Sequence, residues 1–223
     1  MQDLPLTSSL TSTRTLAHYQ TNAASFWEGT RDHDVTQNYA ALLDHLASDP
    51  PSRILDFGCG PGRDLGYLRS LGHEAIGLDG CPAFCRMARE YSGCEVLEQD
   101  FLALSLPPAY FDGVFANASL FHVPGSELPR VLDELRASLT PAGVLFSSNP
   151  RGNNDEGWHG GRYGCYWDEG RWCEIVTAAG FDLIDRYYRP TGKPRAEQPW
   201  LATVWRKGRT LPHATGTSSD TLP

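Results

Sequence analysis

The sequence has little positive charge, no long apolar run and no cysteine pair at metal-binding spacing. It carries 19 Lys and Arg residues against 27 Asp and Glu residues, which gives a net charge of −8. An acidic chain repels a phosphate backbone, so nucleic acid is not expected as a partner. No apolar stretch reaches the ~18 residues that a spanning helix needs, so no membrane segment is expected.

The N-terminal residues and the cysteines give consistent indications about the compartment. Residues 1–5 lack the basic-then-apolar order of a secretory signal. None of the six cysteines forms a C-x-x-C pair, so neither a zinc site nor a disulfide framework is expected. We therefore expect reduced thiols, no bound metal and a cytoplasmic protein.

The chain does contain one long series of alternating strand and helix patterns. This order predicts a single α/β domain over 16–206, with a mostly parallel seven-stranded sheet and helices on both faces. A flexible arm, a helical cap, the sheet-containing core and a disordered tail are expected at 1–15, 16–52, 53–206 and 207–223. Within the core, the Gly- and aromatic-rich residues 150–167 are too many for a plain connection and predict a lid loop.

The expected elements follow from apolar spacing and turn residues. The cap predicts two helices separated near Gly29. Strands are expected at 53–57, 74–78, 94–97, 111–116 and 144–148, with a closing antiparallel pair at 181–188 and 200–205. Helices of the core are expected at 63–71, 82–91, 128–139 and 168–179.

A glycine-rich turn joins the first strand of the core to its first helix, in the segment Asp56-Phe57-Gly58-Cys59-Gly60-Pro61-Gly62. Gly58 and Gly60 remove Cβ atoms where a ligand touches the backbone, and the helix N-terminus adds free N–H groups. Dinucleotide-binding proteins place a third glycine where Arg63 stands here. Asp56 would repel a pyrophosphate, whereas it suits the ammonium group and positive sulfur of S-adenosylmethionine.

Further candidate ligands follow the next strands. Asp79 lies at a strand end about 20 residues after the turn, where a carboxylate accepts hydrogen bonds from ribose hydroxyls. Asp100 could receive the adenine amino group, with Phe101 beside the ring. The expected cofactor-binding residues are Asp56, Gly58, Cys59, Gly60, Asp79, Gly80, Asp100, Phe101, Asn117 and, from the cap, Trp27.

In this order and spacing, residues 53–148 resemble the class I S-adenosylmethionine-dependent methyltransferases. The resemblance implies a Rossmann-like fold and S-adenosylmethionine as cofactor, and it says little about the methyl acceptor. The glycine order and the missing Tyr-x-x-x-Lys motif disfavour an NAD-dependent dehydrogenase. A methyltransferase for another small amine, thiol or carboxylate remains open, as does a non-catalytic nucleoside-binding regulatory module.

Candidates for the acceptor side surround this core. The expected catalytic residues, Asn117 and His122, follow the fourth strand, in the loop that faces the methyl group in this fold. His122 could orient the acceptor or take a proton, or it could simply cap the next helix. Arg151 could grip a carboxylate through two hydrogen bonds. The expected substrate-binding residues are Arg31, Gln37, Asn38, Phe121, Asn149, Arg151, Trp158, Tyr163 and Tyr166.

A narrower resemblance covers about residues 24–206, to the methyltransferase of ovothiol biosynthesis. Among the segments that carry it are Phe26-Trp27-Glu28-Gly29-Thr30-Arg31, Ser148-Asn149-Pro150-Arg151-Gly152, Gly161-Arg162-Tyr163-Gly164 and Gln198-Pro199-Trp200-Leu201-Ala202. Many relatives carry it as a C-terminal domain fused to a sulfoxide synthase, of which this sequence has no segment. The resemblance implies methylation of the imidazole π-nitrogen of 5-thiohistidine to ovothiol A, and coupling to a separate sulfoxide synthase and lyase.

Overall fold

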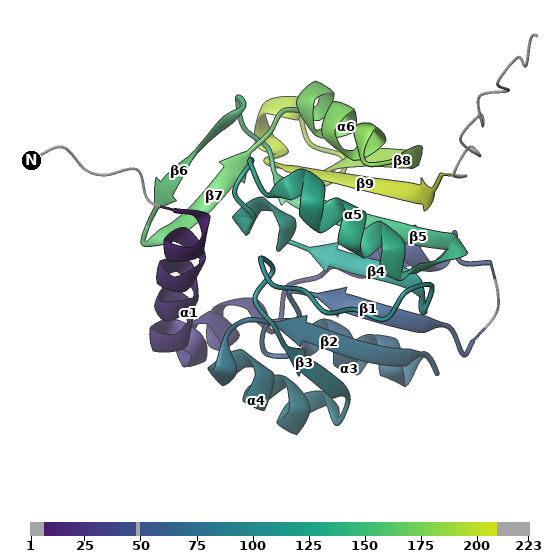
Figure 1. Ribbon diagram of the computed structural model, residues 1–223, viewed down its shortest axis with the longest axis horizontal. Coiled ribbons are helices and arrows are strands. Elements are labelled where there is room, and N and C mark those ends of the chain that lie inside the picture. The colour runs from purple at the N-terminus through teal and green to yellow at the C-terminus, as the bar shows by residue number, and fades with distance from the viewer. Residues whose placement is uncertain (1–6, 48–49, 209–223) are drawn as a thin grey trace, which may run out of the picture.

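The central element of the fold is a seven-stranded sheet in the order β3-β2-β1-β4-β5-β9-β8 (Figure 1). The computed structural model describes residues 7–47 and 50–208. The strands of the sheet are β1 (Arg53–Phe57), β2 (Glu74–Asp79), β3 (Glu95–Glu98), β4 (Phe111–Asn117), β5 (Leu139–Pro150), β8 (Phe181–Arg189) and β9 (Trp200–Lys207). Strands β1 to β5 pair in parallel, whereas β9 runs antiparallel to its neighbours β5 and β8. The predicted fold class, a Rossmann-like and mostly parallel seven-stranded sheet, is confirmed.

Two helical layers cover the sheet. One face is covered by α2 (Thr36–Leu43), α3 (Arg63–Ser70) and α4 (Pro82–Ser92), and the other by α5 (Leu128–Ser138) and α6 (Glu169–Ala178). Successive side chains of a strand point to opposite faces. Ile54 therefore packs in the first layer and Leu55 in the second, and both are fully buried. The apolar run that predicted β1 reflects burial on both sides.

The sheet has its topological switch between β1 and β4. Strand β2 pairs with one side of β1 and β4 with the other, so the connections leave in opposite directions. Ligands of open α/β sheets bind outside the carboxyl ends of the strands at such a point. The glycine turn after β1 and Asn117 at the end of β4 lie there.

The N-terminal residues differ from the expected flexible arm. Helix α1 (Ser8–Thr30) begins at Ser8, where the Thr7 side chain accepts a hydrogen bond from the Leu10 amide. Its cavity-facing residues recur at helical spacing: Ser12, Leu16, Tyr19 and Phe26. Because the stripe starts with polar residues, hydrophobic periodicity alone did not reveal it. Residues 1–6 of the expected arm lie outside the described residues.

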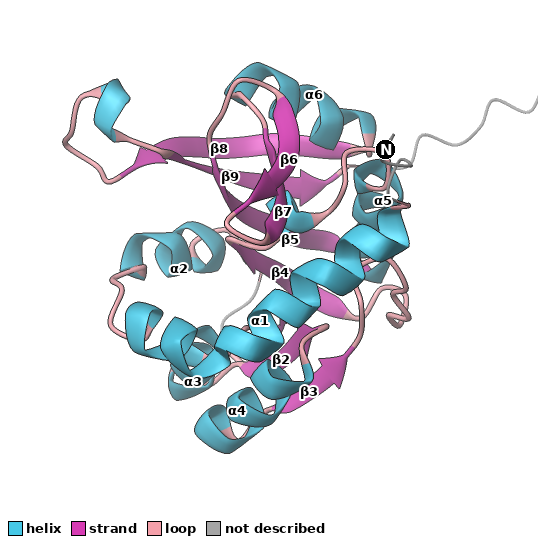
Figure 2. Ribbon diagram, turned by 90° about the vertical axis from the view of Figure 1, so that its left-hand side faces the viewer, coloured by secondary structure: helices cyan, strands magenta, loops and turns pink. Residues whose placement is uncertain are grey.

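The expected lid loop at 150–167 contains a β-hairpin. Strands β6 (Asp155–His159) and β7 (Arg162–Tyr166) pair antiparallel around Gly160 and Gly161, whose φ angles are 56° and 86°. A Gly-Gly pair suits a two-residue turn that needs positive φ at both positions. The hairpin lies against α1 (Figure 2), where the Tyr163 amide donates to the Thr15 hydroxyl at 3.1 Å. Most of the expected tail, from residue 209 on, is outside the described residues.

Candidate active site

A cavity lies at the switch point, with α1 along one side. Six of the expected cofactor residues line it: Gly58, Gly60, Asp79, Gly80, Asp100 and Phe101. Its lining includes two carboxylates and, among the residues that the structure describes, no Lys or Arg. The charge of this lining favours a ligand with a positive centre.

The glycine turn gives the cavity its bare backbone wall. Gly58 has a φ of 78°, and a Cβ built on it would lie 2.4 Å from the Cβ of Ser119. The Gly58 amide donates to the Leu78 carbonyl at 2.8 Å, which fixes the turn to β2. A side chain at Gly58 would therefore strain the backbone and push the loop after β4 away from the cavity.

Asp79 is buried at the end of β2 and faces the cavity. Its two carboxylate oxygens accept from the Gly60 amide at 3.0 Å and the Cys81 amide at 2.8 Å. Each oxygen retains a further lone pair that can accept from a ligand hydroxyl. Burial raises the pKa of Asp79 to about 6, although the backbone N–H groups favour its charged form.

Asp100 and Phe101 line the cavity beside the glycine turn and the end of β2: a Cβ built on Gly58 would lie 3.2 Å from the Phe101 ring. The Asp100 carboxylate accepts from the Leu102 amide at 2.9 Å and from the Ser12 hydroxyl of α1 at 2.7 Å. The Phe101 ring stacks on Phe57, with ring centroids 4.2 Å apart. Asp100 is thus hydrogen-bonded to both the core and α1, and the Phe101 ring is fixed by its contact with Phe57 of the sheet.

His122 lies in η1 (Leu120–His122) and lines the cavity with both ring nitrogens engaged. Its Nδ1 lies 2.6 Å from the Tyr163 carbonyl oxygen, so this nitrogen must carry the proton. Nε2 then accepts from the Tyr19 hydroxyl, 2.7 Å away. Burial lowers the pKa of His122 to about 4, and the imidazole is neutral at pH 7. These bonds join η1, α1 and the hairpin and leave no ring nitrogen free to take a proton.

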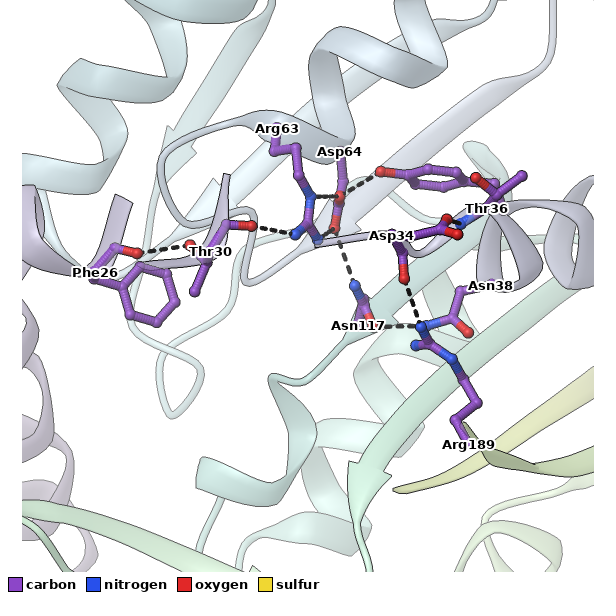
Figure 3. Close-up of polar contacts among 10 residues, drawn as sticks. Phe26, Thr30, Asp34, Thr36, Asn38, Arg63, Asp64, Asn117 and Arg189 are labelled. Atoms are coloured by element: carbon purple, nitrogen blue, oxygen red, sulfur yellow. Dashed lines mark hydrogen bonds and ion pairs between the residues drawn. The ribbon is translucent and has the colours of Figure 1, made fainter. Parts of the chain in front are cut away.

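Asn117 is held in a buried polar network that does not line the cavity (Figure 3). Its amide nitrogen donates to Asp64 at 3.2 Å, and its oxygen accepts from Asn38 at 3.0 Å. Asp64 also accepts from Arg63 and from the Tyr39 hydroxyl. The network fixes the end of β4 to α2 and α3, so Asn117 and Asn38 position the site through their neighbours.

Three other expected cofactor residues lie away from the cavity lining. Asp56 is buried below the turn, where its Oδ2 has no partner among the described residues and burial raises its pKa, helped by the charge of Asp64. The buried Cys59 side chain packs in the core between the sheet and α3 and α4. Trp27 packs on Tyr91, with ring centroids 4.9 Å apart. In each case the spacing placed the residue near the turn without giving the direction of its side chain.

The expected acceptor residues are dispersed. Arg31 pairs with Glu28 and Asp32 at the surface, and the exposed Gln37 meets Tyr187 only through its backbone carbonyl. Arg151 donates to the Arg195 carbonyl at 3.0 Å, and its guanidinium lies 5.6 Å from the Tyr188 ring centroid. Asn149 is buried with both amide atoms unpaired in the described residues.

The aromatic residues of the hairpin and η1 form a connected group beside the cavity. Phe121 packs on His122 at 3.9 Å and faces Tyr166 at 6.0 Å between centroids. Trp158 meets Tyr163 at 5.6 Å on the other hairpin face, where Arg14 lies over the indole. Phe121 therefore links Tyr166 of the hairpin to the cavity residue His122, whereas Trp158 lies under Arg14 of α1.

Sequence reasoning missed the contribution of α1 to the cavity. The residues concerned are Ser12, Thr15, Leu16, Tyr19 and Phe26. Their helical spacing of three, four or seven residues was the available signal. Phe84, at the start of α4, was also missed and packs against Tyr19 and Phe26.

Side chains for metal binding or disulfide formation are not grouped in the described part of the chain. No group of three or more His, Cys, Asp or Glu side chains in that part is placed to hold a metal ion. All six cysteines are free. Within residues 7–47 and 50–208, no helix has the length and apolarity to cross a membrane.

Comparisons with known proteins agree with this geometry. Residues 54–143 match the family model described as a methyltransferase domain. The chain is 34% identical over 121 residues to trans-aconitate 2-methyltransferase of Azoarcus sp. (strain BH72), covering 53% of this chain and 46% of that protein. It is 32% identical over 106 residues to malonyl-[acyl-carrier protein] O-methyltransferase of Enterobacter lignolyticus (strain SCF1), covering 47% and 41%. The match thus spans less than half the length of either relative.

A solved structure extends the likeness to nearly the whole chain. It is the 1,6-didemethyltoxoflavin-N1-methyltransferase of Burkholderia thailandensis, which contains bound 1,6-didemethyltoxoflavin and S-adenosylhomocysteine. The TM-score is 0.77 at 23% identity, over 93% of both chains. The shared fold is the Rossmann-like fold of methyltransferases, and the sequence match to a methyltransferase domain covers residues 54–143 of the 223.

Proposed function

We propose that the protein transfers the methyl group of S-adenosylmethionine to a small polar acceptor, and that this acceptor is 5-thiohistidine. The observation that carries the cofactor part is the cavity itself. Asp79 and Asp100 face it from two strand ends, the Gly58 turn leaves its backbone open, and no described cation lines it. These features suit a nucleoside that carries a positive sulfur and disfavour a pyrophosphate.

The residues of the chain fit this cofactor in separate roles. The free lone pairs of Asp79 suit two ribose hydroxyls, and Asp100 beside the Phe101 ring suits an adenine. Gly58 and Gly60 allow the methionine part to approach the backbone. The bound cofactor supplies an electrophilic methyl group, while the chain aligns the acceptor and excludes water.

The acceptor is proposed from the loops around the cavity. These loops carry the resemblance to the ovothiol methyltransferase, including the hairpin that lies beside His122. An imidazole nitrogen already holds the lone pair that attacks the methyl group, so alignment matters more than a base. His122, which is neutral and hydrogen-bonded at both ring nitrogens, is consistent with a reaction that needs no base. A separate sulfoxide synthase and lyase would supply the substrate.

A second candidate is methylation of a carboxylate. The first curated relatives are named for trans-aconitate and malonyl-[acyl-carrier protein], which favours this alternative. It uses the same cofactor cavity and differs only in the acceptor.

The test compares three acceptors. Purified protein is incubated with S-adenosylmethionine and either 5-thiohistidine, histidine or trans-aconitate, and products are identified by mass spectrometry. We expect one methyl group on the imidazole of 5-thiohistidine and almost none on histidine, because a site built for a polar group rejects an analogue that lacks it. Equal rates on the two imidazoles would contradict the assignment, and a methyl ester of trans-aconitate alone would support the second candidate.

A further inference from the structure

Arg162, the first residue of β7, is a cation without a carboxylate partner among the described residues. Its Nη1 donates to the Tyr19 hydroxyl at 3.3 Å. Its Nε is buried and has no hydrogen-bond partner, and Nη2 has none either within residues 7–47 and 50–208. The buried Nε is costly, because it has lost water without gaining a partner.

The surroundings of Arg162 connect it to the cavity. Tyr19, which it contacts, lines the cavity and donates to the cavity residue His122. The guanidinium carbon lies 5.7 Å from the Tyr19 ring centroid. Tyr166, two positions beyond Gly164 on the same face of β7, faces Phe121. Arg162 does not itself line the cavity; it contacts the lining residue Tyr19, where the hairpin meets α1.

The contacts along α1 show where Arg162 lies relative to the residues proposed for the cofactor. At one end Ser12 bonds to Asp100, and at the other end Phe26 lies 3.8 Å from a Cβ built on Gly60. Tyr19 lies between these two contacts along the helix. Arg162 thus contacts α1 between the residue that meets the acid suited to adenine and the residue that meets the glycine turn.

The free donors of Arg162 have a defined chemical complement. Nε and Nη2 lie side by side on the planar guanidinium, and this edge matches the two oxygens of one carboxylate. No Asp or Glu of the described residues occupies that edge. Arg151, which sequence reasoning chose for a carboxylate, is already used by the Arg195 carbonyl and lies over Tyr188.

We propose that Arg162 binds the carboxylate of the methyl acceptor through Nε and Nη2, which makes a small carboxylate the acceptor class of this enzyme. The inference rests on the proposed function, and it applies to 5-thiohistidine and to trans-aconitate, because each carries a carboxylate other than the group that is methylated. A bound acceptor would satisfy the buried Nε and neutralise the unpaired charge. It would also link the acceptor to Tyr19 and thereby to the contact between α1 and the hairpin.

The test is a binding cycle on the full chain saturated with S-adenosylhomocysteine. Calorimetry measures the affinity for 5-thiohistidine and for its decarboxylated counterpart, 5-thiohistamine, in the native protein and in Arg162→Gln. In the native protein, loss of the carboxylate should weaken binding about tenfold or more, as expected for a charged pair. In Arg162→Gln, 5-thiohistidine should weaken by a similar factor, while 5-thiohistamine should stay within about twofold.

Two further variants keep the result interpretable. Arg162→Lys keeps the charge but loses the fork, so it should recover only part of the affinity. Arg171→Gln removes a surface arginine that pairs with Glu174 and should leave every affinity unchanged. Trans-aconitate serves as a second carboxylate probe, with the same expected loss in Arg162→Gln.

The results that would contradict the inference about Arg162 differ from those that would contradict the proposed function. An unchanged preference for the carboxylate compound in Arg162→Gln would overturn the inference. Loss of S-adenosylhomocysteine affinity in that variant would assign Arg162 to the cofactor's own carboxylate and also overturn it. If the native complex binds neither carboxylate, the inference fails while the cofactor assignment stands. Failure to bind S-adenosylhomocysteine would instead overturn the proposed function.

Discussion

Asp79 carries a charge in a place where the fold makes charge costly. It is buried at the carboxyl end of β2, and two backbone amides only partly offset the loss of water. Its pKa is therefore raised from 3.8 to about 6. Because the native state holds this proton more tightly than the unfolded chain does, Asp79 makes the free energy of unfolding fall as the pH rises from about 4 to about 6.

The same shift predicts how cofactor affinity depends on pH. The carboxylate form accepts ribose hydroxyls better than the protonated form, so the affinity for S-adenosylhomocysteine should fall as the pH drops through about 6. Asp79→Asn should weaken binding at pH 7.5 by about 1–3 kcal/mol and remove this pH dependence. Calorimetry across the pH range measures both effects. The exposed Asp133→Asn is the control, and an unchanged profile in Asp79→Asn would show that this acid does not hold the ribose.

Asn149 shows the opposite case, a neutral polar group that the described residues leave unpaired. Both amide atoms are buried without a partner at the end of β5. Asn149→Val should raise the free energy of unfolding by about 1 kcal/mol, because an unsatisfied amide is removed from a strand. If the amide binds the acceptor, methyl transfer should fall at least about tenfold in the same variant.

Thermal unfolding measures the stability of Asn149→Val, and steady-state kinetics measures its rate of methyl transfer. Asn153→Val, at an exposed position of the following loop, is the matched control and should change neither quantity much. Lower stability with full activity would mean that Asn149 has a purely structural role.

At the scale of elements, strand and helix order was predictable, whereas contacts between distant elements were not. The boundaries of β1 and α5 follow from their apolar patterns, since each packs directly in the core. The hairpin had a local signal in Gly160 and Gly161, which an interpretation based on loop length overlooked. No local signal links Tyr19 to His122 or Asn38 to Asn117, because tertiary packing alone brings these pairs together.

Helix α1 acts as a cover whose attachment can be weakened without disturbing the core. The Tyr19 hydroxyl bridges His122 and Arg162. Tyr19→Phe should leave both groups without this partner and should speed dissociation of S-adenosylhomocysteine about tenfold, the effect of one lost hydrogen bond. Stopped-flow displacement measures the rate. Tyr91→Phe, on an exposed ring, is the control, and an equal rate in Tyr19→Phe would mean that α1 does not retain the cofactor.

At the scale of the whole molecule, the parallel sheet explains why the candidate site was partly predictable. Gly58, Asp79 and Asp100 follow three neighbouring strands, so their shared edge could be inferred from strand order. Trp27 and Arg151 belong to segments outside this order, and their side chains point to other partners. The cofactor side of the cavity was thus open to prediction, whereas the acceptor side depends on how α1 and the hairpin fold over it.

The most direct test of the central claim is calorimetric titration of the purified chain with S-adenosylhomocysteine and, separately, with NAD. The acidic cavity and the Gly58 turn predict saturable binding of about one equivalent of S-adenosylhomocysteine and no measurable binding of NAD. Binding of NAD without S-adenosylhomocysteine would contradict the account.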